Sequence, residues 1–177
     1  MSRDVPTFEL ASASTAHTLA IGRAVGRCCR EGDVITLEGE LGAGKTQLVR
    51  GLAEGLGLDA SQVSSPTFVV VQEYEPAGEA GGALSLIHVD AYRVAGPDDL
   101  VSVGFDLDDA EYRTGAVVAI EWPARLGTAF SDALGVAIDH APPSRCVSLT
   151  LGNAWAERFE ALRRALADTD TSPGASE

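Results

Sequence analysis

Eight consecutive residues, 39–46, have the types and order needed to bind a phosphate. They read Gly-Glu-Leu-Gly-Ala-Gly-Lys-Thr, which fits the pattern G-x-x-x-x-G-K-[ST]. The glycines allow the backbone to bend so that several N–H groups point at one phosphate. Lys45 supplies a compact positive charge for the β- and γ-phosphates, and the hydroxyl of Thr46 is a ligand for Mg²⁺. The sequence therefore predicts a site for a nucleoside triphosphate and Mg²⁺.

The residues expected to contact the nucleotide belong to this turn and to the start of the helix after it. They are Gly39, Gly42, Ala43, Gly44, Lys45, Thr46 and Gln47. Lys45 is the only lysine among the 13 basic residues of the chain. Because the arginine guanidinium is planar and forked, arginine does not replace lysine at this position. The use of lysine only here, in a chain that otherwise uses arginine, favours a phosphate-binding lysine over an ordinary glycine-rich turn. A single lysine also excludes a guanine-specific Asn-Lys-x-Asp motif, which favours ATP.

Two acidic residues follow apolar segments that are typical of buried strands. Asp90 follows residues 84–89, and Glu121 follows residues 116–120. We interpret Asp90 as a second anchor for Mg²⁺, and Glu121 as the carboxylate that orients the attacking water or joins the Mg²⁺ ligands. Each also has a structural interpretation, with Asp90 as a cap or turn residue and Glu121 as the partner of an arginine.

Four further residues near these acids are open to more than one interpretation. Thr67 offers its hydroxyl to Mg²⁺ or to the γ-phosphate in a switch-like segment, or it belongs to a turn fixed by Pro66. Trp122 packs near the nucleotide, forms a partner surface or lies in the core. Arg93 binds phosphate or pairs with an acid. His88, separated from Asp90 by one residue, is expected on the opposite face of its strand and is interpreted as structural.

Composition excludes several other classes of protein. The chain has 177 residues, 13 basic and 26 acidic, for a net charge of −13, and it has no dense Lys/Arg run. Strong direct binding to nucleic acid or to an anionic membrane is therefore disfavoured. The longest apolar run, residues 116–120, is too short to span a membrane. The three cysteines lack the spacing of zinc ligands, so we expect no zinc, small buried cysteines and a reducing cytoplasm.

The elements that must position these residues alternate between strand and helix patterns. Strands are predicted over residues 5–10, 34–38, 68–74, 84–89, 116–120, 136–140 and 146–151. Helices are predicted from Ser12 or Ser14 to before Gly32, from the phosphate-binding turn to Gly57, over 98–103 and 106–112, and from 153 or 154 to 167. A Gly/Ala turn is expected over 77–83.

This alternation predicts an α/β fold, with the site at the carboxyl ends of the strands. We expect one P-loop NTPase domain over residues 1–167, in which a mostly parallel, mixed sheet is flanked by helices. An acidic tail over residues 168–177 is expected to be disordered.

Four motifs in this order resemble the TsaE (YjeE) family over residues 12–126. They are Gly-Glu-Leu-Gly-Ala-Gly-Lys-Thr, Ser-Pro-Thr-Phe, His-Val-Asp-Ala-Tyr-Arg and Ile-Glu-Trp. Members are small bacterial P-loop ATPases required for the N6-threonylcarbamoyl modification (t6A) of adenosine 37 in tRNAs that read ANN codons. The resemblance implies a slow ATPase that docks on the TsaD–TsaB heterodimer, which transfers the threonylcarbamoyl group. It also implies that the ATP cycle supports repeated turnover and that tRNA is contacted only indirectly.

The resemblance also implies a role for each matching residue. Lys45 and Thr46 bind phosphates and Mg²⁺, Thr67 belongs to a switch-like segment, Asp90 is the acid associated with Mg²⁺, and Glu121 and Trp122 form a functional pair. Gln47 and Ala91 depart from the family's usual residues. Two alternative functions are a small-molecule P-loop kinase, which needs an acceptor pocket and a closing lid, and a nucleotide switch that does not hydrolyse.

Overall fold

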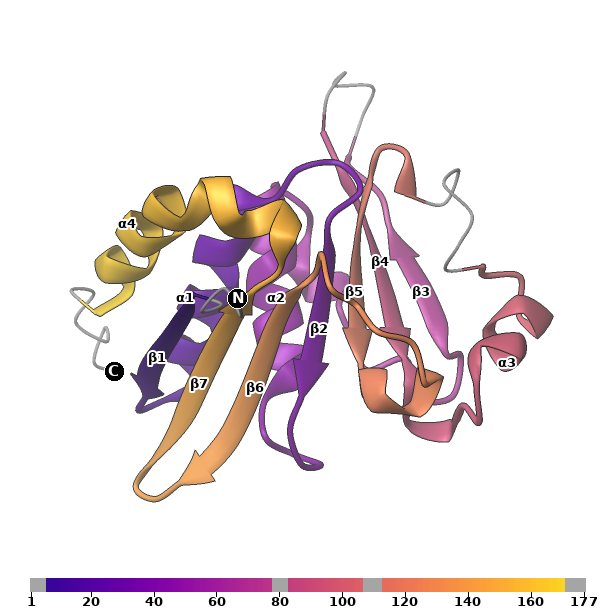
Figure 1. Ribbon diagram of the computed structural model, residues 1–177, viewed down its shortest axis with the longest axis horizontal. Helices are drawn as coiled ribbons and strands as arrows, with labels where there is room; N and C mark the ends of the chain where they lie inside the picture. Colours follow the sequence, from indigo (N-terminus) through magenta and orange to yellow (C-terminus); the bar gives the residue numbers. More distant parts are fainter. Residues whose placement is uncertain (1–5, 78–82, 107–112, 171–177) are drawn as a thin grey trace, which may run out of the picture.

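Seven strands form one sheet in the order β1-β7-β6-β2-β5-β4-β3 (Figure 1). The computed structural model describes residues 6–77, 83–106 and 113–170. The strands are β1 (Thr7–Ser12), β2 (Val34–Glu38), β3 (Val71–Tyr74), β4 (Ser85–Asp90), β5 (Ala116–Glu121), β6 (Leu134–Ala141) and β7 (Ser144–Leu151).

The centre of the sheet is parallel and its edges are antiparallel. Strands β6, β2, β5 and β4 pair in parallel, whereas β1 with β7, β7 with β6, and β3 with β4 pair antiparallel. The mixed sheet is therefore confirmed. The register aligns Asp90 with Glu121 at the ends of β4 and β5. This alignment places both predicted acids at the same edge of the sheet, beside the end of β2.

Helices and 3₁₀ turns cover both faces of the sheet. The α-helices are α1 (Thr15–Cys28), α2 (Lys45–Leu56), α3 (Pro97–Ser102) and α4 (Phe159–Asp170). Short 3₁₀ turns are η1 (Ala60–Gln62), η2 (Ala91–Arg93), η4 (Pro123–Leu126) and η5 (Asn153–Arg158). In Figure 1, α1 and α2 lie behind the strands, with α4 beside α1 and with α3 at the far end of the sheet.

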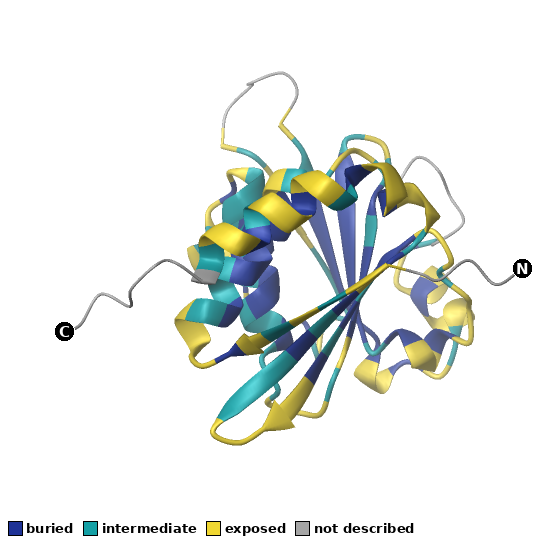
Figure 2. Ribbon diagram, turned by 60° about the vertical axis from the view of Figure 1, so that its left-hand side comes forward, coloured by how far each residue is buried: buried dark blue, intermediate teal, exposed yellow. Residues whose placement is uncertain are grey.

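Strand alternation divides the core into two clusters, one on each face of the sheet. Ile35, Val117 and Ala119 pack in the cluster that contains α1 and α2. Val118 and Ile120, which point the other way along β5, pack with Leu100 of α3. The central strands are accordingly buried while the outer helix surfaces are exposed (Figure 2). Because Glu121 alternates with Ile120, its side chain lies on the face of α2.

Helices α1 and α2 pack with their backbones in contact. A Cβ added to Gly22 would lie 2.1 Å from Leu48 O, and one added to Gly51 would lie 2.0 Å from Leu19 O. One turn further along, a Cβ added to Gly26 or to Gly55 would lie 2.4 Å from a backbone oxygen of the other helix. Only glycine fits at such distances. The close contact fixes α2, and therefore the phosphate-binding turn at its start, against α1.

Helix α1 begins after Ser14, one of the two residues expected to cap it. Ser14 is the N-cap, and its hydroxyl accepts a hydrogen bond from His17 N at 3.1 Å. The expected hairpin around Pro142 and Pro143 is also present, as β6 and β7.

The predicted strand over residues 68–74 is wrong in its first half. Val69 N and Val70 N both donate to Pro66 O, which forms a turn, and Val70 has a left-handed backbone with φ 72°. The strand therefore begins only at Val71.

The carboxyl-terminal segment also differs from the expectation. Residues 153–158 form a 3₁₀ turn, and the α-helix then continues to Asp170, beyond the predicted limit of 167. The remainder of the expected tail, all but the first residue of the helix expected at 106–112, and part of the turn at 77–83 lie outside the described residues. The three cysteines are half-buried rather than fully buried. Burial raises the pKa of the Cys28 and Cys29 thiols.

Candidate functional site

The phosphate-binding turn lies between the end of β2 and the start of α2. Its three glycines all have positive φ angles, 147° at Gly39, 81° at Gly42 and 113° at Gly44. Residues with a side chain rarely adopt positive φ angles, which explains why the motif has glycine at these three positions. Gly44 is the N-cap of α2, and the free N–H groups of this helix end lie at the turn.

Lys45 is held at this turn by its own backbone neighbours. Its side chain is only 4% exposed, and Nζ donates to Gly39 O at 2.8 Å and to Glu40 O at 3.0 Å. Nζ also lies 4.1 Å from the centre of the Trp122 ring. Burial lowers the pKa of the Lys45 ammonium, and the carboxylates of Glu121 and Asp90 act in the opposite direction. A phosphate bound here would replace the two carbonyl contacts.

Glu121 is a buried carboxylate whose contacts both fall on one oxygen. It is 3% exposed, and Oε1 accepts a hydrogen bond from the Thr46 hydroxyl at 3.1 Å. Nε2 of His88 lies 2.9 Å from the same oxygen. The expectation that His88 points away from Asp90 is therefore wrong. Residues two apart in a strand share a face, so His88 and Asp90 both point toward α2.

Asp90 is bonded to the segment that precedes β3. Its Oδ2 accepts from the Thr67 hydroxyl at 2.7 Å and from the Ser65 hydroxyl at 3.2 Å. Its Oδ1 accepts from Tyr92 N at 3.0 Å, so Asp90 also caps the short turn after β4. The interpretation of Asp90 as a cap residue is therefore confirmed, and its role as an anchor for Mg²⁺ stays a prediction. Thr67 lies in the turn at Pro66, as one of its two interpretations predicts, and its hydroxyl is bonded to Asp90; its role in a switch-like segment stays a prediction.

Aromatic rings surround the site on the side of β4 and β5. Trp122 directly follows Glu121, and its backbone is left-handed, with φ 61° and ψ 48°. Such a conformation is strained for a residue other than glycine. The Trp122 and Tyr92 rings lie 5.2 Å apart. The Arg93 guanidinium lies 4.6 Å from the Phe68 ring, and no acid pairs with it among the described residues.

Most of these groups, though not His88 or Phe68, line one cavity of about 410 Å³. Its lining residues are Leu41, Gly42, Gly44, Lys45, Thr46, Gln47, Ser65, Thr67, Asp90, Tyr92, Arg93, Glu121 and Trp122. All the predicted site residues are there except Gly39 and Ala43. Gly39 contacts Lys45 through its carbonyl, and Ala43 lines a neighbouring hollow toward β6 and β7. The cavity therefore joins the turn, the hydroxyl-bearing residues Thr46, Ser65, Thr67 and Tyr92, and two carboxylates.

The residues of this cavity fit a nucleoside triphosphate with Mg²⁺. Hydroxyl and carboxylate oxygens are hard donors of the kind that Mg²⁺ prefers, with phosphate oxygens completing its ligands. Among the described residues, no cluster of three His, Cys, Asp or Glu side chains could hold a metal ion. The Thr46 hydroxyl and the Asp90 carboxylate are side chains of this cavity that could hold the metal together with the phosphates.

Sequence reasoning missed three residues that line the cavity, Leu41, Ser65 and Tyr92, and placed His88 on the wrong face of its strand. Ser65 lines the cavity and donates to Asp90, and the Ser-Pro-Thr motif beside it was the available signal. His88 contacts Glu121, and the two-residue spacing from Asp90 was the signal that it shares the face of the site.

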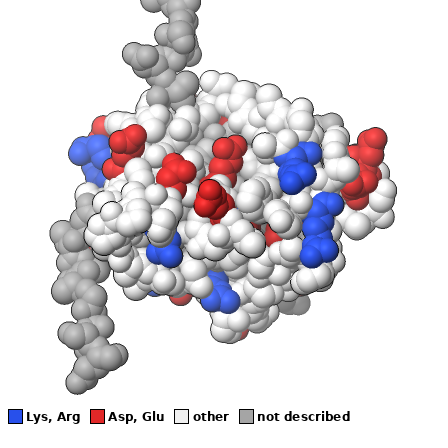
Figure 3. Space-filling model, turned by 90° about the horizontal axis from the view of Figure 1, so that it is seen from below, with Lys and Arg blue, Asp and Glu red and all other residues white. Residues whose placement is uncertain are grey.

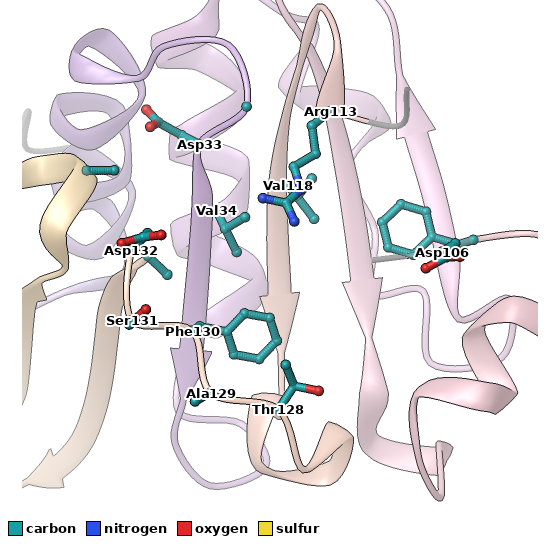
Figure 4. Close-up of a pocket in the computed structure, with 14 residues that line it drawn as sticks. Asp33, Val34, Asp106, Arg113, Val118, Thr128, Ala129, Phe130, Ser131 and Asp132 are labelled. Carbon is teal, nitrogen blue, oxygen red and sulfur yellow. The ribbon is translucent and has the colours of Figure 1, made fainter. Parts of the chain in front are cut away.

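A second, smaller cavity lies on the other face of the sheet. It measures about 170 Å³ and contains none of the predicted site residues. Figure 4 shows the Arg113 side chain directed toward Val118 of β5, with Phe130 in front of the strands and Asp33 at the start of β2. This second cavity lies outside the phosphate-binding site.

The molecule presents mixed charges at the end where β2 stops. Figure 3, a view onto the lower end of Figure 1, shows acidic side chains between separate basic ones. No continuous basic patch is visible there among the described residues. Among these residues no helix is long and apolar enough to cross a membrane.

The mixed sheet, the glycine turn and the paired acids define a P-loop NTPase fold. A family model, Threonylcarbamoyl adenosine biosynthesis protein TsaE, matches residues 12–147. The chain therefore belongs to the TsaE family, whose role is in the biosynthesis of t6A in tRNA.

Individual relatives agree with the family match. The chain is 39% identical over 143 residues to the tRNA threonylcarbamoyladenosine biosynthesis protein TsaE of Streptomyces coelicolor, covering 77% of this chain and 92% of that protein. It is 40% identical to the TsaE of Treponema pallidum, covering 66% and 79%. The crystal structure of Bacillus subtilis YdiB superimposes with a TM-score of 0.64 at 28% identity, covering 96% of this chain and all of that one.

Proposed function

We propose that this chain is a Mg²⁺-dependent ATPase that acts with the TsaD–TsaB complex in t6A modification of tRNA, in the cytoplasm. The observation that carries the proposal is the convergence of Lys45, Thr46, Asp90 and Glu121 on one cavity. Membership of the TsaE family supports the t6A pathway. The exclusion of a guanine-specific motif by the single lysine supports ATP as the nucleotide.

Each residue has a task that its position supports. Lys45 binds the β- and γ-phosphates after leaving the carbonyls of Gly39 and Glu40. Thr46 and Asp90 are the candidate side-chain ligands for the metal. Glu121 orients the attacking water and accepts its proton, because it is the buried carboxylate beside Thr46. When bound, Mg²⁺ would neutralise part of the negative charge on the phosphates.

Partner binding is supported by the exposed apolar residues near the cavity. Leu41 lines the cavity and is 79% exposed, and Phe68, next to Thr67, is 83% exposed. Val69, which follows Phe68 in the chain, is 66% exposed, and adjoining exposed apolar side chains of this kind are typical of protein interaction sites. The net charge of −13 agrees with a chain that binds a protein and leaves the tRNA contacts to its partners.

The test is the release of inorganic phosphate from ATP, with and without Mg²⁺, and then with TsaD–TsaB added. We expect slow release that requires Mg²⁺ and changes when the complex is added. Lys45→Ala is the matched control and should release none. Phosphate found on a metabolite instead of in solution would support the small-molecule kinase. Nucleotide binding with no release in either condition would support a switch that does not hydrolyse.

A further inference from the structure

A histidine is buried directly behind the candidate catalytic carboxylate. His88 has no exposed surface, and its Nε2 lies 2.9 Å from Oε1 of Glu121. The two residues belong to neighbouring parallel strands, because β4 pairs with β5 and aligns His88 with Ala119. The His88 side chain therefore reaches the Glu121 carboxylate from the interior of the protein.

The contacts of the ring assign its tautomer. Glu121 Oε1 is an acceptor, so the facing His88 Nε2 must carry a proton; a bare Nε2 would direct its lone pair at the carboxylate. Nδ1 is buried and has no hydrogen-bond partner among the described residues. A proton on Nδ1 would therefore lack an acceptor, and its burial would cost free energy. The contacts of the two ring nitrogens therefore place a proton on Nε2.

The two donors constrain one oxygen of Glu121 and not the other. His88 and the Thr46 hydroxyl both reach Oε1, whereas Oε2 makes no hydrogen bond to a described residue. Glu121 nevertheless lines the cavity. A carboxylate fixed through one oxygen retains a defined orientation for the other, which is what a group that orients water requires.

We propose that His88 is a positioning residue, which holds the Glu121 carboxylate in place for the hydrolytic step through the Nε2–H···Oε1 hydrogen bond. The inference rests on the proposed ATPase function. It assigns His88 no contact with nucleotide or metal. The proposal differs from a role as an ordinary core residue. Substituting a core residue would affect folding, whereas substituting His88 would also affect the orientation of Glu121.

A matched pair of amide variants tests this role. In His88→Gln the amide nitrogen reaches nearly as far as Nε2, whereas in His88→Asn it is one methylene short and cannot reach Oε1. We expect His88→Asn to lower kcat for ATP hydrolysis about 10- to 100-fold, the usual size of a lost supporting hydrogen bond. Its affinity for ATP should change little, and His88→Gln should recover most of the rate. Equal rates in both variants, or a parallel loss of affinity and rate, would overturn the proposal.

A spectroscopic measurement tests the hydrogen bond without any activity. The imidazole ¹⁵N signals of the labelled full chain, assigned by their absence in His88→Gln, should show a proton on Nε2. A ring with no proton on Nε2 would overturn the assignment.

The combined variant gives an independent check. In Glu121→Ala, adding His88→Asn should cause no further loss of rate, since the carboxylate to be positioned is gone. A further loss would mean that His88 acts elsewhere.

Failure of this inference is distinguishable from failure of the proposed function. Absence of phosphate release from the wild type, with and without TsaD–TsaB, would overturn the proposed ATPase and the positioning role with it. Normal release from both the wild type and His88→Asn would overturn the positioning role alone.

Discussion

Glu121 accepts two hydrogen bonds on one oxygen. A substitution that keeps these hydrogen bonds is therefore expected to affect ATP hydrolysis without affecting ATP binding. In Glu121→Gln the amide oxygen can still accept from Thr46 and His88, so the local packing is kept while the negative charge is lost. We expect kcat for ATP hydrolysis to fall at least about 100-fold, the usual contribution of a positioned base. ATP affinity should be nearly unchanged.

The measurement is steady-state hydrolysis beside equilibrium binding of ATP. Glu160→Gln, on the exposed surface of α4, is the control and should behave as the wild type. A loss of ATP binding in Glu121→Gln, with the rate at saturation intact, would move Glu121 from the chemical step to nucleotide binding.

Trp122 offers a direct signal for the state of Lys45. Its ring lies over the ammonium at 4.1 Å, and under the proposed function a bound phosphate would draw Lys45 away from its present contacts. We expect the tryptophan fluorescence to change when Mg²⁺ and ATP are added. The second tryptophan, Trp155, is buried in the core beside Arg158 and should contribute a constant background. The same change in Trp122→Phe would show that the signal does not arise at the site.

Much of the site could be predicted from local sequence, and the rest depends on register. The phosphate-binding turn is contiguous, so its residue types identify it directly. Asp90 and Glu121 could be brought together because ends of parallel strands meet at one edge. The hydrogen bonds from Ser65 and Thr67 to Asp90 could not be predicted, because they depend on how a loop folds back over β4. His88 was placed on the wrong face although strand alternation was sufficient to place it correctly.

Among the elements, the helix pair α1–α2 carries the clearest prediction. A methyl group at Gly51 would lie 2.0 Å from Leu19 O, so the helices must separate. We expect Gly51→Ala to lower the free energy of unfolding by about 1–3 kcal/mol, because overpacking outweighs the better helix propensity of alanine. Because α2 begins at the phosphate-binding turn, ATP affinity should fall as well.

The measurement for this pair is urea denaturation. Gly96→Ala is the control, because a Cβ there meets no atom within 4 Å and the backbone φ of 176° suits any residue. Equal stability of Gly51→Ala and the wild type would show that the helix contact can relax.

The elements themselves could largely be predicted, and their limits less well. Periodicity and capping located α1, α2 and the central strands. The strand expected from Phe68 was shortened by a turn at Pro66, since apolar residues predict a strand without regard to backbone hydrogen bonds. The pairing of β1 with β7 joins residues at opposite ends of the chain, and no local pattern specifies that register.

At the scale of the whole molecule, a buried ion pair connects the carboxyl-terminal segment to the core. Arg158 contacts both oxygens of Asp33, and its guanidinium also donates to Cys28 O at 3.1 Å and to Ala154 O at 2.7 Å. The two residues are 125 positions apart, which is why sequence reasoning did not pair them. Arg158→Ala would leave the Asp33 carboxylate buried without its partner.

We expect Arg158→Ala to lower the free energy of unfolding by about 3–5 kcal/mol, the usual cost of removing one partner of a buried pair. Arg163→Ala is the control. It removes an exposed pair with Glu160 on α4 and should cost at most about 1 kcal/mol. Urea denaturation of both variants decides the point. Comparable effects in the two would show that Asp33 gains water when Arg158 is removed.

The central claim is that this chain serves t6A formation through the phosphate-binding turn. The most direct measurement is the t6A content of tRNA from a bacterial strain depleted of its own TsaE and supplied with this chain or a variant. We predict that the wild type and Arg163→Ala restore t6A, whereas Lys45→Ala, present at the same level and folded, does not. Restoration of t6A by Lys45→Ala would contradict the account, because the function would then not require the nucleotide site.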